Sequence, residues 1–327
     1  MIVRRGLRKA KRLAMSKMPK GRPRGVILMY HRIATTAFDP WSLGVSETSF
    51  ESQLDVLVSR CYPMSLDDFV EAWHRKELPP RAVAVTFDDG YRDNYSHGLP
   101  ALQRAGVPAT VFVTTNVLDT TRSLWWEELC QIFTSEQVND SELVLKSSKK
   151  KQSWIYNGPV TSGVEGRKMF DSVWEFCLTQ PESERIKSME QIRKWFKANG
   201  GRTFKLPEML SQNDLRQLAG NKFITIGSHT VCHPCMSVER PEYNSSELVK
   251  SKEIIEALTG KTVTHFAYPY GDFSEDLIEL VDSAGYSSAC LAGGGAVTNK
   301  SHVFQLPRIA VPDIGGEDFD ALLNKHL

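Results

Sequence analysis

Seven apolar runs rich in β-branched residues recur along the 327-residue chain, and helical patterns lie between most of them. Most of these runs are continuous rather than alternating, which is typical of strands covered on both faces, as in parallel sheets. Strands that alternate with helices indicate βα units, and seven such units favour a barrel. The predicted strands are residues 25–31, 83–89, 108–115, 223–229, 265–271, 287–293 and 303–311.

Helical periodicity separates several of these runs. We predict helices over residues 49–61, 65–74, 99–105 and 274–284. The second begins at Ser65, which has Asp68 three residues later and so resembles a capping box. The third ends at Gly106, a residue type favoured just beyond a helix. The sequence therefore predicts a distorted (β/α)7 barrel spanning residues 25–327.

One long stretch interrupts this alternation, because no convincing strand is recognisable between residues 116 and 220. It contains a Trp-rich helical segment at 124–133, a polar stretch at 147–153 and a long amphipathic helix at 181–199. We predict a mainly helical insertion at about 120–210. The sequence does not distinguish a lid, a specificity domain and a packing element.

Basic residues are concentrated in the first 24 positions, which hold ten of the 40 Lys and Arg residues and none of the 39 Asp and Glu residues. Apolar residues recur there at helical spacing, and a basic amphipathic helix can lie on an anionic membrane surface. A solvated tail is the alternative. Basic residues interrupt every candidate core of a signal peptide, and no run approaches the ~20 apolar residues of a membrane span. We expect a cytoplasmic protein, either free or peripheral to the membrane through residues 1–24.

The overall charge and the cysteines exclude some other classes. A net charge of +1 gives no indication of a nucleic-acid partner. Of the six cysteines, Cys232 and Cys235 form a Cys-x-x-Cys pair, but no second pair accompanies it, as a structural zinc site would require. We expect reduced, mostly buried cysteines.

Two adjacent carboxylates, Asp88 and Asp89, follow the predicted strand at 83–87, and Gly90 turns the chain directly after them. Barrel enzymes place catalytic groups at the carboxyl ends of their strands. Two carboxylates this close do not both stay ionised in a dry site unless a cation or a proton intervenes. A solvated Asp-Asp-Gly turn is the alternative for this motif alone.

Two histidines follow another predicted strand in the same way. His229 and His233 are four residues apart after the strand that ends at Gly227, which suits two ligands of one metal ion. Two imidazoles and one carboxylate leave an open coordination position, the pattern of a catalytic rather than a structural zinc site.

These motifs resemble those of the polysaccharide deacetylases, carbohydrate esterase family four. The resemblance rests on Thr-Phe-Asp-Asp-Gly at 86–90 and His-Thr-x-x-His-Pro at 229–234. It is supported by Tyr-His-Arg at 30–32, Phe-x-x-Gln-Leu at 50–54 and Tyr-Pro-Tyr-Gly at 268–271. It covers about residues 25–120 and 205–312, so the basic segment and the insertion lie outside it.

The resemblance implies that Asp88 is the general base and that Asp89, His229 and His233 hold one divalent metal ion, for which Zn²⁺ is the expected identity. Such an ion activates a bound water and polarises the acyl oxygen. The family also implies an oxyanion contact from the backbone near Tyr270, with Pro269 and Tyr270 as a groove wall.

The chain departs from the family pattern where many members carry a Leu-x-His histidine, because Leu306-Pro307-Arg308 stands there. Arginine stays protonated and is a poor proton donor, so we expect Arg308 to orient Asp88 or the substrate. His31 is the candidate general acid, and a structural role at the strand end is its alternative. His265 and His302 are weaker candidates because each begins a predicted strand. The family's third motif also lacks its arginine, since Ala267 and Tyr268 precede Pro269.

The expected function is hydrolysis of the N-acetyl group of an amino sugar in a polysaccharide, oligosaccharide or glycolipid, within bacterial cell-surface polysaccharide synthesis. A deformylase or another non-peptide amide hydrolase would use the same ligand set. A carbohydrate-binding pseudoenzyme is a third hypothesis, for which the missing Leu-x-His histidine is the main support.

Overall fold

Seven parallel strands close into a barrel in the computed structural model, which describes residues 24–120 and 123–327. The strand order is β1-β10-β9-β8-β7-β4-β3, and β3 pairs with β1 to close the ring. The seven predicted strands are therefore confirmed, and so is the barrel. Their observed bounds are β1 (Gly25–Tyr30), β3 (Ala82–Phe87), β4 (Ala109–Val113), β7 (Ile224–Ser228), β8 (His265–Ala267), β9 (Ser288–Gly294) and β10 (Leu306–Ala310).

Burial on both faces explains why these runs are continuously apolar. Every residue of β1, β3 and β4 is buried, because one face lies inside the barrel and the other lies under helices. The closing pair aligns Gly25 with Ala82 and Tyr30 with Phe87 over the full length of both strands. A two-residue strand, β2 (Tyr62–Pro63), pairs with β3 outside the ring.

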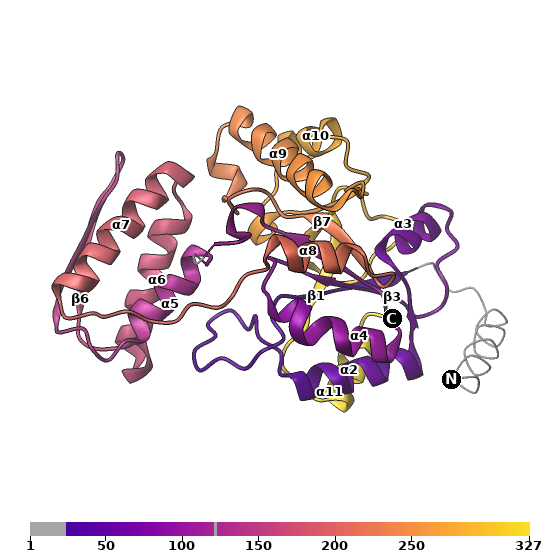
Figure 1. Ribbon diagram of the computed structural model, residues 1–327, viewed down its shortest axis with the longest axis horizontal. Coiled ribbons are helices and arrows are strands. Elements are labelled where there is room, and N and C mark those ends of the chain that lie inside the picture. Colours follow the sequence, from indigo (N-terminus) through magenta and orange to yellow (C-terminus); the bar gives the residue numbers. More distant parts are fainter. Residues whose placement is uncertain (1–23, 121–122) are drawn as a thin grey trace.

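Helices surround the barrel, with α9 and α10 on one side and α2, α4 and α11 on another (Figure 1). Ser65 caps α3 by accepting the Asp68 N–H, and Gly106 ends α4 with a φ of 65°, as predicted. The outer helices are α2 (Glu47–Arg60), α3 (Leu66–His74), α4 (Leu99–Ala105), α8 (Gln212–Ala219), α9 (Pro241–Thr259), α10 (Glu275–Ser283) and α11 (Gly316–Asn324). Short helical turns are η1 (Asn94–Gly98), η2 (Thr115–Val117), η4 (Met236–Val238) and η5 (Pro269–Gly271).

A second hydrophobic cluster lies between β4 and α8 along the chain and stands to one side of the barrel (Figure 1). Its core includes Phe133, Phe170 and Ile192, all at most 1% exposed. It consists of α5 (Trp125–Thr134), β5 (Ser141–Lys146), β6 (Lys151–Tyr156), η3 (Val160–Ser162), α6 (Val164–Leu178) and α7 (Glu182–Ala198). We call these elements the insertion.

The antiparallel hairpin β5–β6 corrects the expectation that this stretch has no strand. The polar stretch at 147–153 is its turn and the start of β6. In β6, five of the six residues are not buried, because residues on both faces of this strand reach solvent. A mostly exposed strand carries no apolar run, which is why the sequence pattern did not reveal it.

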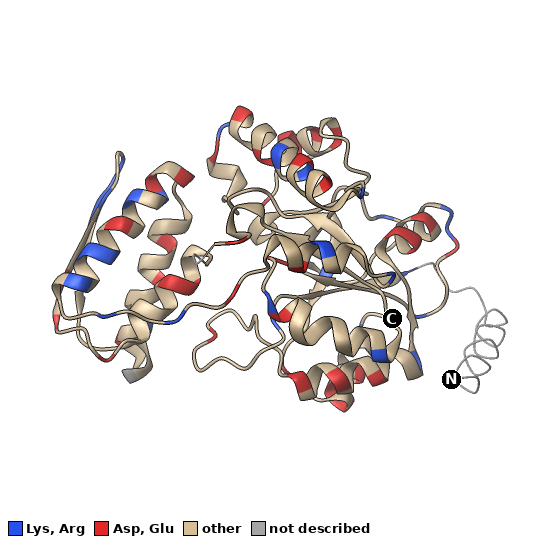
Figure 2. Cartoon of the chain, viewed as in Figure 1, with Lys and Arg blue, Asp and Glu red and all other residues tan. Residues whose placement is uncertain are grey.

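Charges of both signs are distributed along the exposed faces of α7 and α9 (Figure 2). No helix among residues 24–120 and 123–327 has the length and apolarity to cross a bilayer. The predicted basic amphipathic helix within residues 1–24 lies almost wholly outside the described residues.

Candidate metal centre

The carboxylate pair and the histidine pair meet at one end of the barrel. Asp88 and Asp89 directly follow β3, and His229 directly follows β7. β4 alone separates these two strands in the sheet, and all three are parallel, so their carboxyl ends lie side by side. A φ of 74° at Asp89 and 84° at Gly90 turns the chain sharply after the strand.

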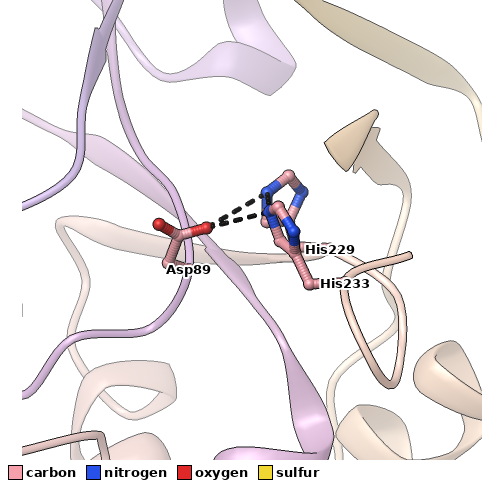
Figure 3. A group of neighbouring side chains, drawn as sticks. All are labelled: Asp89, His229 and His233. Atoms are coloured by element: carbon pink, nitrogen blue, oxygen red, sulfur yellow. Dashed lines mark hydrogen bonds and ion pairs between the residues drawn. The ribbon is translucent and has the colours of Figure 1, made fainter. Parts of the chain in front are cut away.

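Asp89, His229 and His233 converge on one point, with all three side chains buried (Figure 3). Asp89 Oδ1 lies 3.4 Å from His229 Nε2 and 3.2 Å from His233 Nε2, and the two nitrogens are 3.1 Å apart. A tetrahedral ion with bonds of ~2.0–2.1 Å separates its ligand atoms by about 3.3 Å. This group therefore has the donor types, spacing and burial of a metal site. It is the only group of this kind within the described part of the chain.

The same contacts explain the protonation of these groups. Burial tends to raise the pKa of Asp89, but hydrogen bonds from His229 and His233 outweigh it and hold that pKa below its usual range. Burial lowers the pKa of His233 to about 4, although Asp89 opposes the shift. Burial also acts to lower the pKa of His229, but the hydrogen bond to Asp89 and the charge of Asp88 raise it above its usual value. A neutral imidazole and an ionised carboxylate are the forms that bind a metal ion, so the pKa shifts of Asp89 and His233 favour binding.

His229 is oriented by a contact on its far side, where Nδ1 lies 2.7 Å from the carbonyl oxygen of Ala267 on β8. Such contacts to the second ring nitrogen fix a ligating imidazole and leave its Nε2 for the metal. The Thr230 hydroxyl accepts a hydrogen bond from the His233 N–H at 3.0 Å, which closes the turn between the two histidines.

Asp88 lies beside this group and is paired with Arg308 of β10. Nη1 and Nη2 of Arg308 donate to the two carboxylate oxygens at 2.7 and 2.6 Å, and both residues are buried. Burial raises the pKa of Asp88, but the Arg308 charge, followed by His229, brings it below its usual value. Of the two roles expected for Arg308, this geometry fits the orientation of Asp88.

The remaining predicted residues divide between the two ends of the barrel. His31 directly follows β1, and its charge contributes to lowering the pKa values of Asp88 and Asp89, so it lies near them. The Tyr270 ring lies 4.5 Å from the His233 ring, and Pro269 beside it is buried. His265 instead begins β8 at the opposite end, where it contacts Asp67 and Ser288.

The cysteines behave as expected of small side chains. Cys61, Cys130, Cys177 and Cys290 are buried and form no disulfide bond. Cys232 and Cys235 form no disulfide bond either, and Cys235 Sγ donates to Asp272 at 3.2 Å.

Several residues near the site come from the insertion and were not predicted. The Trp126 ring lies 4.6 Å from the His233 ring, and its Nε1 donates to the Tyr91 hydroxyl at 3.3 Å. That hydroxyl donates in turn to the buried Glu127 at 2.7 Å. The Trp-Trp-Glu-Glu run at 125–128 stands out in the sequence. A local run of aromatic and acidic residues does not reveal, however, which distant strand its side chains will contact.

Comparison with known proteins places this site in a family. The model of the polysaccharide deacetylase family matches residues 75–152 and 191–289, more than half of the chain. The chain belongs to the polysaccharide deacetylase family. As a member, it is a hydrolase of carbon–nitrogen bonds other than peptide bonds. The unmatched gap at 153–190 contains most of β6, α6 and the first half of α7.

Curated relatives of this deacetylase-family chain are distant in sequence but similar in extent. YxkH of Bacillus subtilis (strain 168) is 22% identical over 300 residues, which cover 91% of this chain and 75% of that protein. The poly-beta-1,6-N-acetyl-D-glucosamine N-deacetylase of Staphylococcus aureus (strain MRSA252) is 22% identical over 270 residues, 82% of this chain and 68% of that one.

Solved structures share the fold. The Streptococcus pyogenes deacetylase PplD in complex with acetate has a TM-score of 0.56 at 19% identity, over 93% of this chain and 99% of that one. IcaB from Ammonifex degensii has a TM-score of 0.58 at 16% identity, over 93% and 97%. At sequence identities this low, the structural similarity shows a shared barrel fold and does not indicate the substrate.

Proposed function

We propose that this chain removes the N-acetyl group from an amino sugar in a polysaccharide, oligosaccharide or glycolipid, within bacterial cell-surface polysaccharide synthesis. The observation that carries the proposal is the buried Asp89–His229–His233 group with a second, separately held carboxylate beside it. The staphylococcal relative, named for a poly-N-acetylglucosamine substrate, supports this choice of sugar.

The donor set fits one Zn²⁺ ion, since two imidazole nitrogens and one carboxylate oxygen at this spacing leave a coordination position open. When bound, such an ion lowers the pKa of a coordinated water and polarises a carbonyl oxygen. The neutral His233 and ionised Asp89 described above suit this role.

The chain's own residues then move the protons. Asp88 accepts the proton from the water that attacks the acyl carbon, because Arg308 holds it ionised and fixed beside Asp89. A backbone N–H at Tyr270 donates to the acyl oxygen as it gains negative charge, which is typically worth about 3–4 kcal/mol. His31 donates a proton to the departing amine, and Pro269 and Tyr270 form the groove wall against the sugar.

Acetate release tests the proposal. N-acetylglucosamine oligosaccharides, lipid-linked sugars, sugar nucleotides and their N-formyl analogues are incubated with the Zn²⁺-loaded protein. We expect acetate from at least one acetylated substrate, and about 10²–10⁴-fold slower release by Asp88→Asn, which keeps the metal ligands. Equal release by wild type and Asp88→Asn contradicts the mechanism. Release of formate alone identifies a deformylase, and sugar binding without turnover in calorimetry identifies a pseudoenzyme.

We also propose peripheral membrane contact by the basic segment at residues 1–24, in a chain that works on the cytoplasmic side. Ten basic residues without an acidic one are attracted to anionic lipid, by about 1 kcal/mol for each that nears the surface. Co-sedimentation with anionic vesicles should be lost on deleting residues 1–24 and in neutral vesicles. Equal sedimentation with and without the segment contradicts this proposal.

A further inference from the structure

The ligand loop, residues 229–233, has a backbone that its own sequence does not favour. Thr230 has a φ of 67° and His233 a φ of 53°, a region in which residues with a Cβ are uncommon. Such conformations persist only where surrounding contacts hold them. His233 needs holding in particular, because its Nδ1 is buried without a hydrogen-bond partner among the described residues, whereas His229 has the Ala267 carbonyl.

Two buried charged side chains bind this loop, one from the insertion and one from a helix of the barrel. Arg185, from α7 of the insertion, donates from Nη2 to the carbonyl oxygens of His233 at 3.2 Å and Cys232 at 3.4 Å. Glu247, from α9, accepts the N–H groups of Val231 at 2.9 Å and Cys232 at 2.8 Å. Arg185 is 2% exposed and Glu247 5% exposed. Donors and acceptors of the loop backbone are thus fixed by one cation and one anion.

Stability alone does not account for Arg185. Its Nη1 has no hydrogen-bond partner within the described residues, although its guanidinium pairs with Glu182 and lies 5.4 Å from the Trp125 ring. An apolar side chain of similar volume in place of a buried ion pair is often neutral or stabilising. A buried guanidinium with an unsatisfied N–H therefore suggests a role other than packing.

We propose that Arg185 and Glu247 are positioning residues for the metal site, and that the insertion therefore forms part of that site through Arg185. They act through the backbone of the ligand loop and set where His233 Nε2 lies relative to Asp89. The proposal rests on the metal-dependent function proposed above. It goes beyond that function by giving a separate structural unit a defined effect on metal affinity.

Metal titration of the full-length apoprotein tests this. Zn²⁺ affinity is measured by calorimetry, and the visible absorption of the Co²⁺-loaded protein reports ligand geometry. We expect Arg185→Gln to bind Zn²⁺ about 10–100-fold more weakly, the range for losing an outer contact of a metal ligand, and to change the Co²⁺ spectrum. Arg185→Lys keeps a donor and should recover part of the affinity. Glu247→Gln should weaken binding in the same direction, which provides a second route if Arg185→Gln does not fold.

Arg193→Gln is the matched control. Arg193 lies on the same helix, and it binds Glu128 of α5 through two hydrogen bonds of 2.7 and 2.6 Å, so its loss weakens packing within the insertion without touching the ligand loop. The Zn²⁺ affinity and the Co²⁺ spectrum of the Arg193→Gln variant should equal those of wild type. Wild-type affinity in both Arg185→Gln and Glu247→Gln overturns the inference and leaves the proposed function intact. A wild-type protein that binds no Zn²⁺ overturns both.

Discussion

Arg308 holds Asp88 through both carboxylate oxygens, at 2.7 and 2.6 Å, although 220 positions separate the two residues in the chain. The bond joins the middle of β10 to the residue that follows β3, across β1, which pairs with both strands. Arg308 also donates to the Leu291 carbonyl at 2.6 Å and to the Thr86 hydroxyl at 3.1 Å, so its own position is fixed. Pairing with Arg308 lowers the pKa of Asp88, which makes it a weaker base, and also fixes the orientation of its carboxylate.

Replacement of Arg308 by Lys should lower kcat up to about 100-fold with little change in KM, because an ammonium cannot form the two parallel bonds that orient the carboxylate. Steady-state kinetics on the substrate found in the acetate screen measure this. Zn²⁺ affinity should stay at the wild-type value, since Asp89, His229 and His233 are unchanged. An unaltered kcat would show that the bidentate pair does not position Asp88.

Replacement of His31 by Gln should slow amide hydrolysis by about 10²–10⁴-fold, the usual contribution of a general acid. Hydrolysis of an activated aryl acetate should fall much less, because a phenolate leaves without a proton. Asp88→Asn serves as the control, since loss of the base slows both substrates. A His31→Gln variant that loses both activities equally, or neither, contradicts the role of proton donor.

Zn²⁺ should raise the thermal stability of the protein, because a ligand that binds only the folded state stabilises it by about 2.7 kcal/mol at a concentration of 100 Kd. Thermal unfolding with and without Zn²⁺, after chelator treatment, measures this shift. His233→Ala should abolish most of it. The control is His302→Ala, which removes an exposed histidine distant in sequence from the ligands and should leave the shift unchanged. An equal shift in His233→Ala would place the ion elsewhere.

Asp67 at the other end of the barrel should make stability depend on acid pH. Its pKa is lowered, chiefly by the hydrogen bond with His265 Nε2 at 3.0 Å, while burial opposes the shift. A carboxylate whose folded-state pKa is lowered stabilises the protein above its unfolded pKa of about 3.9, and this contribution is lost as pH falls through the folded value. Asp67→Asn should therefore be less stable than wild type at pH 5–7, by a margin that narrows towards pH 3.

Urea denaturation at each pH measures the difference in unfolding free energy between Asp67→Asn and wild type. Asp68→Asn is the matched control, because Asp68 is likewise exposed in the first turn of α3, and within the described residues it has no bond to a histidine side chain. It loses the same favourable interaction with the helix dipole without losing the His265 bond. A pH-independent margin for Asp67→Asn, or the same profile in both variants, contradicts the assignment.

The sequence by itself determined the barrel and most of its candidate centre. Seven runs buried on both faces must be apolar throughout, so each strand was visible without its neighbours. The Asp and His pairs could be recognised as one site because each follows a predicted strand. Parallel strands bring their carboxyl ends to the same end of a barrel, so residues directly after different strands lie close together. The β5–β6 hairpin was not visible, because a mostly exposed strand such as β6 needs no continuous apolar run.

Only the tertiary structure decided which charged side chains serve the centre from a distance. Nothing local marks Arg185 on an amphipathic helix, Glu247 on another or Glu127 after two tryptophans, because each is defined by the backbone or hydroxyl group it meets after packing. Arg308 was noticed as a departure from a motif, but its partner was fixed only when β10 and β3 paired with the two edges of β1. The burial of a strand or helix can be predicted from the residues of that segment alone. The hydrogen-bond partner of a side chain depends instead on which distant segments the completed fold brings within bonding distance.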